Sequence, residues 1–166
     1  MPNTKAYTVA NATGGRTLLA SGTFSSSALS LTSISGAYKD LILIFENYYR
    51  SGGTDTNFRL NSDSGSNYSW AQYATGLTSF NTSTNNTVLQ TNQPSFNSAP
   101  GSLCMTIHNY ANTNSHKAVT SIFNGNAGGN KNAVWNIGTY ASTNAITGIL
   151  TLDAMTSGSY YLYGVK

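Results

Sequence analysis

The stretch that decides the fold spans residues 58 to 70 and reads Phe58-Arg59-Leu60-Asn61-Ser62-Asp63-Ser64-Gly65-Ser66-Asn67-Tyr68-Ser69-Trp70. Its first three residues alternate apolar and charged side chains, which predicts a half-buried strand. A turn follows, because Asn and Asp side chains hydrogen-bond to the backbone two residues further on and Gly accepts a positive φ. Large aromatic rings come directly after the turn. We expect the stretch to lead from a strand through a surface loop to aromatic side chains that cover the core.

Short apolar runs recur on both sides of this stretch, separated by turns rich in Gly, Asn and Ser. The run Leu41–Phe45 is apolar throughout, which is typical of a strand covered on both faces. Further strands are expected at residues 17–24, 28–31, 87–89, 103–108, 118–123, 134–140, 146–152 and 160–165. No stretch has the period of an amphipathic helix of useful length. The sequence therefore predicts an all-β fold, an antiparallel β-sandwich of the jelly-roll type.

Residues 16–166 are expected to form this single β-sandwich domain, and residues 1–15 a short N-terminal arm. The arm is polar, ends in Gly14-Gly15 and lacks both strand and helix periodicity. It is either a frayed end or a segment that becomes ordered against a partner. Residues 76–100 are predicted to be mostly loop, because polar Asn, Ser and Thr residues dominate them.

Charged residues make up only 8% of the chain, against roughly 25% in an ordinary soluble domain. The basic residues are scattered and form no stripe, so the sequence does not indicate a nucleic-acid partner. The longest apolar run is too short to span a bilayer, and no signal-peptide pattern is present. We therefore expect a soluble protein that is made in a cytosol and has neither a nucleic-acid nor a membrane partner.

Side chains suited to catalysis are few: the acids are Asp40, Glu46, Asp55, Asp63 and Asp153, and the histidines are His108 and His116. A glycosidase would need two facing carboxylates. A nucleophilic serine would be expected in a Gly-x-Ser-x-Gly turn, which the chain lacks. The lone cysteine, Cys104, has no partner for a disulfide or a metal cluster. We expect no enzymatic activity and no cofactor.

The turn at residues 61–67 resembles a calcium-binding loop only in part. It holds one carboxylate, Asp63, where such loops alternate several, and its glycine comes one position early. An Asx-turn explains the same residues, because Asp side chains accept hydrogen bonds from their own backbone. The turn is therefore expected to be structural, and no metal is predicted.

Four aromatic residues beside polar loops give the one positive signal for binding: Tyr48, Tyr49, Trp70 and Tyr73. Such rings could stack on the sugars of a glycan. A position in the core or in a subunit interface explains them as well, because Tyr and Trp are enriched in both. This second interpretation is the favoured one.

Three parts of the chain together resemble a group of small β-rich virion proteins of tailed bacteriophages. They are residues 31–43, residues 58–68, and a C-terminal part made of residues 145–149 and 160–165. His108-Asn109-Tyr110-Ala111 followed by Lys117 fits the same pattern. The shared motifs are turns and strand edges without a catalytic signature, and residues 1–15 and 76–100 take no part. Members of this group occur as capsid decoration proteins and as parts of tail fibres or other tail appendages.

The resemblance implies a non-enzymatic structural protein on the virion surface, synthesised in the host cytoplasm. The chain has no collagen repeat, no heptads and no fibre-shaft repeat. A compact sandwich with a short arm suits a capsid decoration (cement) protein, which binds the major capsid protein on the outer surface of the shell and stabilises it. The alternative is a tail-fibre or spike component that binds host-surface glycans.

The C-terminal run also carries an expectation about assembly. Residues 160–165 are apolar or aromatic on both faces of the predicted strand, and such a strand needs cover on both sides. We expect an identical subunit to cover part of Tyr160, Tyr161 and Tyr163. We expect the subunits to form a closed ring of three, a homotrimer. The arm should then reach a neighbouring chain or the shell.

Overall fold

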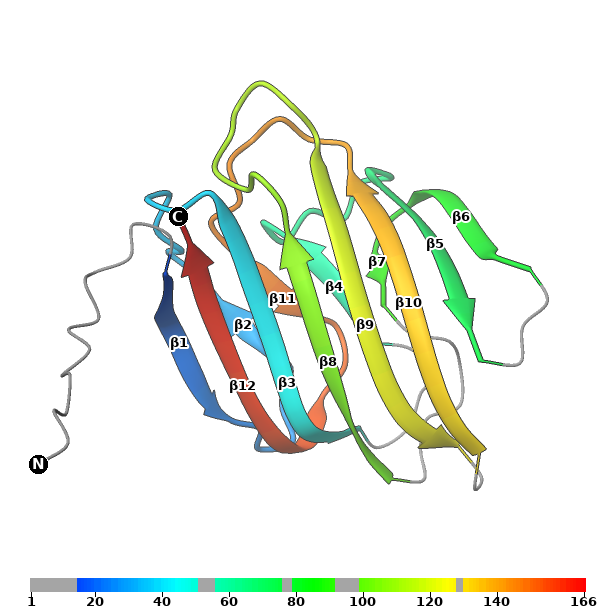
Figure 1. Ribbon diagram of the computed structural model, residues 1–166. Helices are drawn as coiled ribbons and strands as arrows, with labels where there is room; N and C mark the ends of the chain where they lie inside the picture. The colour runs from blue at the N-terminus through cyan, green and yellow to red at the C-terminus, as the bar shows by residue number, and fades with distance from the viewer. Residues whose placement is uncertain (1–14, 51–55, 76–78, 92–98, 128–129) are drawn as a thin grey trace, which may run out of the picture.

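The computed structural model describes residues 15–50, 56–75, 79–91, 99–127 and 130–166. In these ranges every regular element is a β-strand and no helix is present. The strands form two antiparallel sheets, and the smaller sheet lies behind the larger one in Figure 1. The predicted all-β antiparallel fold is confirmed, and the two sheets are consistent with a β-sandwich. The jelly-roll connectivity stays a prediction.

The larger sheet has eight strands and the smaller one has four (Figure 1). In spatial order, the larger sheet contains β1 (Arg16–Thr23), β12 (Met155–Val165), β3 (Asp40–Arg50), β8 (Ala99–Ile107), β9 (Lys117–Ala127), β10 (Asn130–Tyr140), β5 (Tyr68–Ala74) and β6 (Asn81–Asn86). The smaller sheet contains β2 (Ser30–Leu31), β11 (Ile149–Thr151), β4 (Asn57–Leu60) and β7 (Leu89–Gln90). The first strand, β1, is therefore an edge strand of the larger sheet and pairs with the last strand, β12, so that Arg16 lies opposite Val165.

The core lies between the two sheets. Every second residue of β3 points into it, so that Leu43 and Phe45 are fully buried. From the smaller sheet, Phe58 of β4 meets Phe45 with ring centroids 5.9 Å apart. Where Leu89 of the smaller sheet approaches β10, the chain has Gly138, and a side chain at that position would collide with the leucine. Alternation along the strands thus fills the space between the layers.

The turn after β4 forms as predicted and fixes the neighbouring loop. Asn61 adopts a positive φ of 55°. Its side-chain oxygen accepts a hydrogen bond from the Thr147 N–H at 2.8 Å, and its nitrogen donates to the Ala145 carbonyl at 2.9 Å. Asp63 accepts the Gly65 N–H at 2.7 Å, which is the expected Asx-type contact.

The same stretch joins the two sheets, because β4 belongs to the smaller sheet and β5 to the larger one. The hydroxyl of Tyr68, at the start of β5, accepts the Leu60 N–H at the end of β4 at 2.9 Å. The Tyr68 ring is fully buried and stacks on Tyr140, with centroids 5.0 Å apart. The aromatic cover predicted after the turn therefore begins with Tyr68.

Two strands differ from the sequence-based expectations. Residues 68–74 were expected only as aromatic cover and residues 81–86 as loop, but they form β5 and β6. β6 is an edge strand that is almost free of apolar residues, and it is held by backbone pairing to β5. Hydrophobic alternation cannot reveal such a strand, which explains the error. Residues 76–78 and 92–98 of the predicted loop, and residues 1–14 of the predicted arm, lie outside the described residues.

Candidate interaction surface

The face of the larger sheet that is turned away from the smaller sheet carries two rows of mostly apolar side chains. Strand register places residues of neighbouring strands directly beside one another in each row. The first row is Tyr161, Ile44, Cys104, Ile122, Trp135 and Tyr73. The second row is Leu18, Tyr163, Ile42, Thr106, Thr120, Ile137 and Ala71. We call these two rows the outer face.

Several large side chains of the outer face are open to solvent. Ile122 is 63% exposed and Trp135 is 53% exposed, and the two are neighbours across β9 and β10. Tyr73 and Ile137 are each 44% exposed. Single exposed apolar residues are ordinary, whereas a contiguous set across several strands marks an interaction site.

No residue of the two rows is charged. Arg16 and Asp40 lie on one side of the two rows along the strands, and Glu46 lies on the other side, where it lines one wall of a hollow. A partner that covers the rows themselves therefore need not neutralise charge within them, which lowers the desolvation cost of forming an interface.

Directly behind the most exposed part of the outer face, the interior is polar. Ser121, Asn136 and Gln72 lie side by side on the inner surfaces of β9, β10 and β5, and all three are buried. The Asn136 side chain donates a hydrogen bond to the Gln90 carbonyl at 2.6 Å. This polar row is flanked on the same inner surface by buried apolar side chains, among them Phe123 and Val134, while Ile122 and Trp135 point outward.

Three shallow hollows interrupt the outer face. Their walls contain Ala71, Thr82 and Ile137 in the first, Ile44, Cys104 and Ile122 in the second, and Tyr73, Ile122 and Trp135 in the third. Ile122 stands between the second and the third hollow. The relief is that of ridges and grooves between side chains, without a cluster of acids and bases around a cleft. Such a surface suits packing against another macromolecule.

The four aromatic residues expected to mark binding separate in the structure. Tyr48 and Trp70 are buried, and the Tyr48 hydroxyl lies 3.3 Å from Thr56 Oγ1, so neither ring is presented to a ligand. Burial also raises the pKa of Tyr48 far above its ordinary value. Tyr49 is half-buried, whereas Tyr73 is exposed beside Phe80, with ring centroids 5.6 Å apart. The favoured interpretation, a structural position, describes Tyr48 and Trp70.

Sequence reasoning overlooked Trp135, Ile122 and Ile137 as surface residues. The predicted strand over residues 134–140 is confirmed as part of β10, but no face was assigned to Trp135 and Ile137 from the sequence. A signal was available, because Asn136 between them is polar and the alternation therefore favours Trp135 and Ile137 on one face. The alternation alone does not tell which face turns to the core.

The three tyrosines proposed for a subunit interface lie on different faces of β12. Tyr160 points inward and its ring contacts Phe24 at 5.6 Å. Tyr161 and Tyr163 belong to the outer face, where both are half-buried. β12 is not an edge strand, since β1 and β3 pair with it on either side. Only Tyr161 and Tyr163 are therefore placed where a second subunit could cover them from outside the sheet.

The acids take structural positions. Asp63 accepts hydrogen bonds from the Gly65 N–H, from the Asn67 side chain at 2.9 Å and from the Tyr140 hydroxyl at 2.9 Å. These contacts, the Gly65 N–H first, lower the pKa of Asp63 below its ordinary value of 3.8. Asp40 accepts the Asn109 N–H at 2.7 Å. Asp55 lies outside the described residues.

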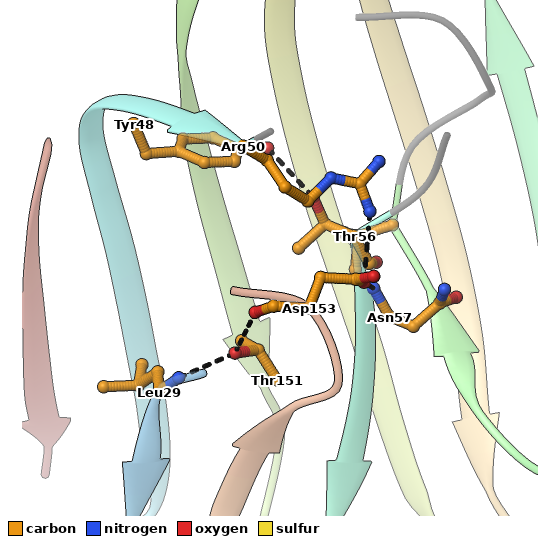
Figure 2. Close-up of polar contacts among 8 residues, drawn as sticks. Leu29, Tyr48, Arg50, Thr56, Asn57, Thr151 and Asp153 are labelled. Carbon is orange, nitrogen blue, oxygen red and sulfur yellow. Dashed lines mark hydrogen bonds and ion pairs between the residues drawn. The ribbon is translucent and has the colours of Figure 1, made fainter. Parts of the chain in front are cut away.

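The remaining described acid with a charged partner is Asp153, which closes one end of the sandwich (Figure 2). Its carboxylate lies 3.1 Å from a guanidinium nitrogen of Arg50, and that arginine is only 6% exposed. The same carboxylate accepts the Asn57 N–H at 3.4 Å. Thr151 continues the network by accepting the Leu29 N–H at 2.8 Å and donating to the Asp153 carbonyl at 3.2 Å. The cluster ties β3 and β4 to the connection between β11 and β12.

A second buried charge holds the opposite end of the sandwich. Lys117 is fully buried at the start of β9. Its ammonium group donates to the carbonyls of Asn112 and Ser115 at 2.6 Å each and to that of Thr143 at 3.3 Å. Burial lowers the pKa of this lysine. The contacts join two loops, so the ammonium group acts as a structural bridge.

The remaining candidate groups do not assemble into a reaction centre. His108 Nε2 lies 3.2 Å from Thr120 Oγ1, and Cys104 is an exposed member of the outer face. Among the described residues, no group of three or more His, Cys, Asp or Glu side chains could hold a metal ion. Over the same ranges no helix has the length and apolar character needed to cross a membrane.

Comparison of the chain with protein-family models, with curated proteins and with solved structures found no match in any of the three.

Proposed function

We propose that this chain is a non-enzymatic structural protein of a tailed-phage virion, and that its leading role is capsid decoration. The outer face is the observation that carries the proposal. It is a broad, uncharged surface with exposed Ile122 and Trp135, and its chemistry fits permanent cover by protein within an assembly. The phage-like motifs at residues 31–43, at residues 58–68, and at residues 145–149 with 160–165 support the choice of a virion as that assembly.

The buried charges support a structural role in a second way. The Arg50–Asp153 pair and the Lys117 bridge hold loops and sheets together. The carboxylate of Asp153 is engaged by Arg50, and that of Asp63 by Gly65, Asn67 and Tyr140, so both serve the fold. A decoration protein needs such rigidity, because it must keep its shape while it clamps neighbouring shell subunits.

A shell-binding experiment tests the proposal. Capsids assembled without this protein are mixed with the purified chain and sedimented, and the shells are then heated. The chain should sediment with the shells and raise the temperature at which they lose their contents. A chain that binds purified tails and leaves the shells unbound and unstabilised contradicts the decoration role.

A tail-fibre component that binds host glycans is the second candidate. One observation favours it: Trp135 and Tyr73 are exposed neighbours on β10 and β5, and the exposed Phe80 ring, just before β6, lies beside Tyr73. Aromatic rings can stack on sugars. A glycan array with the wild-type chain and the Trp135→Ala variant tests it. Binding that is lost in Trp135→Ala and kept in Tyr161→Ala, a ring substitution at the other end of the same row, would favour the fibre role.

A further inference from the structure

We propose that the outer face packs against the outer face of a second copy of this chain, forming a pair with twofold symmetry. The inference deepens the proposed function and rests on its claim that an assembly covers this face. It names the cover as the protein itself, ahead of the shell or a ligand. Four properties of the described residues support it.

The first property is a polar inner row in β9, β10 and β5 that lies directly behind exposed apolar side chains. The chain buries Ser121, Asn136 and Gln72 in the middle of this inner surface and leaves Ile122 and Trp135 exposed on the opposite side of the same strands. The arrangement is favourable if the outward side chains are also removed from water. A covering partner therefore makes both faces of this half of the sheet consistent with the hydrophobic effect.

The second property is the absence of charge in both rows. An uncharged apolar surface is complementary to another surface of the same kind and needs no partner of opposite charge. The nearest described charges on the same side, Asp40 and Glu46, lie on β3 on either side of the two rows, and Glu46 also lines the hollow beside Cys104. They would form the polar rim that surrounds the apolar centre of a typical interface.

The third property is the size of the surface. The first row crosses the six strands from β12 to β5, which corresponds to about 29 Å at a strand spacing of about 4.8 Å. Two rows and their margins extend about 20 Å along the strands. The resulting flat area of about 600 Å², before side-chain relief is added, approaches the roughly 800 Å² that each partner buries in a standard interface.

The fourth property is the relief. The exposed Ile122 stands between two hollows of the outer face, one beside Cys104 and one beside Trp135. In a twofold pair the same surface supplies both the protrusions and the hollows, so each Ile122 can enter a hollow of the other copy. Sheets packed in this way lie about 10 Å apart with interlocking side chains.

This pair differs from the threefold ring expected from the sequence. The ring was inferred from a C-terminal strand that needs cover on both faces. Tyr160 receives its cover from Phe24 of the same chain, and β1 covers the free edge of β12. What remains uncovered is a flat face, with Tyr161 and Tyr163 in it, and a face that meets its own copy closes with two subunits.

Sedimentation velocity of the full-length protein at micromolar concentrations tests the inference. The wild type should have the mass of a dimer, and Ile122→Asp should weaken the pair by at least about tenfold in Kd, because a central apolar contact is replaced by a charge facing its own copy. Leu152→Asp introduces the same charge at another exposed aliphatic residue, outside the rows, and should leave the mass unchanged. Circular dichroism confirms that both variants are folded. A wild-type monomer, a trimer, or an Ile122→Asp variant that still pairs overturns the proposal.

Alkylation of Cys104 then identifies the surface that is used. This thiol is exposed in a single chain and stands next to Ile122 in the first row. Its reaction rate with iodoacetamide should fall several-fold as the protein concentration is raised and the pair forms. A rate that is independent of concentration in a proven dimer shows that another surface is used and overturns the proposal. A monomer whose Cys104 reacts faster after deletion of residues 2–14 overturns it as well, since the chain's own N-terminal segment would then be the cover.

The two hypotheses can fail separately. A protein that stays monomeric and still sediments with shells retains the decoration role and loses the pair. A protein that pairs through Ile122 and binds neither shells nor tails retains the pair and loses the virion role.

Discussion

The two halves of the larger sheet differ in the side chains at the centre of their inner surface. In the half formed by β3 and β8, the inward residues Leu43, Phe45 and Met105 are fully buried and apolar. In the half formed by β9, β10 and β5, the central inward row is polar and the apolar side chains Ile122 and Trp135 face solvent. Both halves contribute side chains to the chain's own core, and the second half in addition leaves apolar side chains exposed on its outer side.

A polar inner row is costly where its hydrogen bonds are not made, and among the described residues Ser121 Oγ and Asn136 Oδ1 have no hydrogen-bond partner. Asn136 donates to the Gln90 carbonyl in β7, so the polar row also links the larger sheet to the smaller one. Leu89, the neighbour of Gln90, packs against Gly138 two residues further along β10. The second half is therefore joined to the smaller sheet by specific polar contacts, Asn136 with Gln90 and Tyr68 with Leu60, in addition to apolar packing. The first half is joined to it through a large aromatic cluster.

The largest effect is expected from truncating the aromatic core of the first half. Phe45→Ala should lower the free energy of unfolding by about 3–5 kcal/mol, because it leaves a cavity where Phe45 contacts Phe24, Tyr48 and Phe58. Ile44→Ala, the adjacent residue on the outer face, should cost less than about 1.5 kcal/mol in the isolated chain. Urea unfolding of both variants measures the contrast. Equal losses would show that the two faces of β3 are buried alike, and the comparison would fail.

The next effect concerns the charge that is buried at the start of β9. Lys117→Met removes the donor that serves three loop carbonyls and should lower the unfolding free energy by about 2–3 kcal/mol. Lys39→Met removes the same charge from an exposed position and serves as the control, with an expected change within about 0.5 kcal/mol. Thermal unfolding checks both variants. A neutral Lys117→Met would mean that this half of the sheet does not depend on the bridge.

A smaller effect should follow from making the polar inner row apolar. Asn136→Leu loses the hydrogen bond to Gln90 and leaves that carbonyl without its partner, so we expect a loss of about 1–2 kcal/mol. Thr139→Leu places the same side chain on the exposed side of the same strand and should change the stability by less than about 0.5 kcal/mol. If Asn136→Leu stabilised the protein, the inner row would be polar for some other reason than its hydrogen bonding.

Some features of this structure could be predicted from the sequence, and others could not. The all-β fold, the turn at residues 61–67 and most strands follow from local alternation and turn chemistry, which depend on neighbours in the chain. The edge strand β6 was not predicted, because its stability comes from pairing with β5, and pairing depends on two segments together. The outer face was not predicted for a similar reason: Trp135 and Ile122 become neighbours only through the register of β9 with β10. Composition alone cannot assign the inner and outer sides of a strand that has apolar residues on both.

The smallest effect concerns pH and the turn that joins the smaller sheet to β5. The hydrogen bonds from Gly65, Asn67 and Tyr140 lower the pKa of Asp63 in the folded chain below the ordinary value of 3.8. The carboxylate therefore contributes stability that is fully present above pH 3.8 and is lost as the pH falls through the lowered folded-state pKa. Because the site is partly open to solvent, the contribution should stay below about 1 kcal/mol.

Asp63→Asn tests this expectation in urea unfolding curves recorded between about pH 7 and about pH 2. The wild type should lose its advantage over the variant as the solution becomes more acidic than pH 3.8. Glu46→Gln, which removes one acid from an exposed position beyond the rows of the outer face, controls for the change in net charge. A wild-type advantage that is unchanged down to the most acidic solution would mean that Asp63 holds the turn by its shape. The link between the smaller sheet and the second half would then be independent of the carboxylate charge.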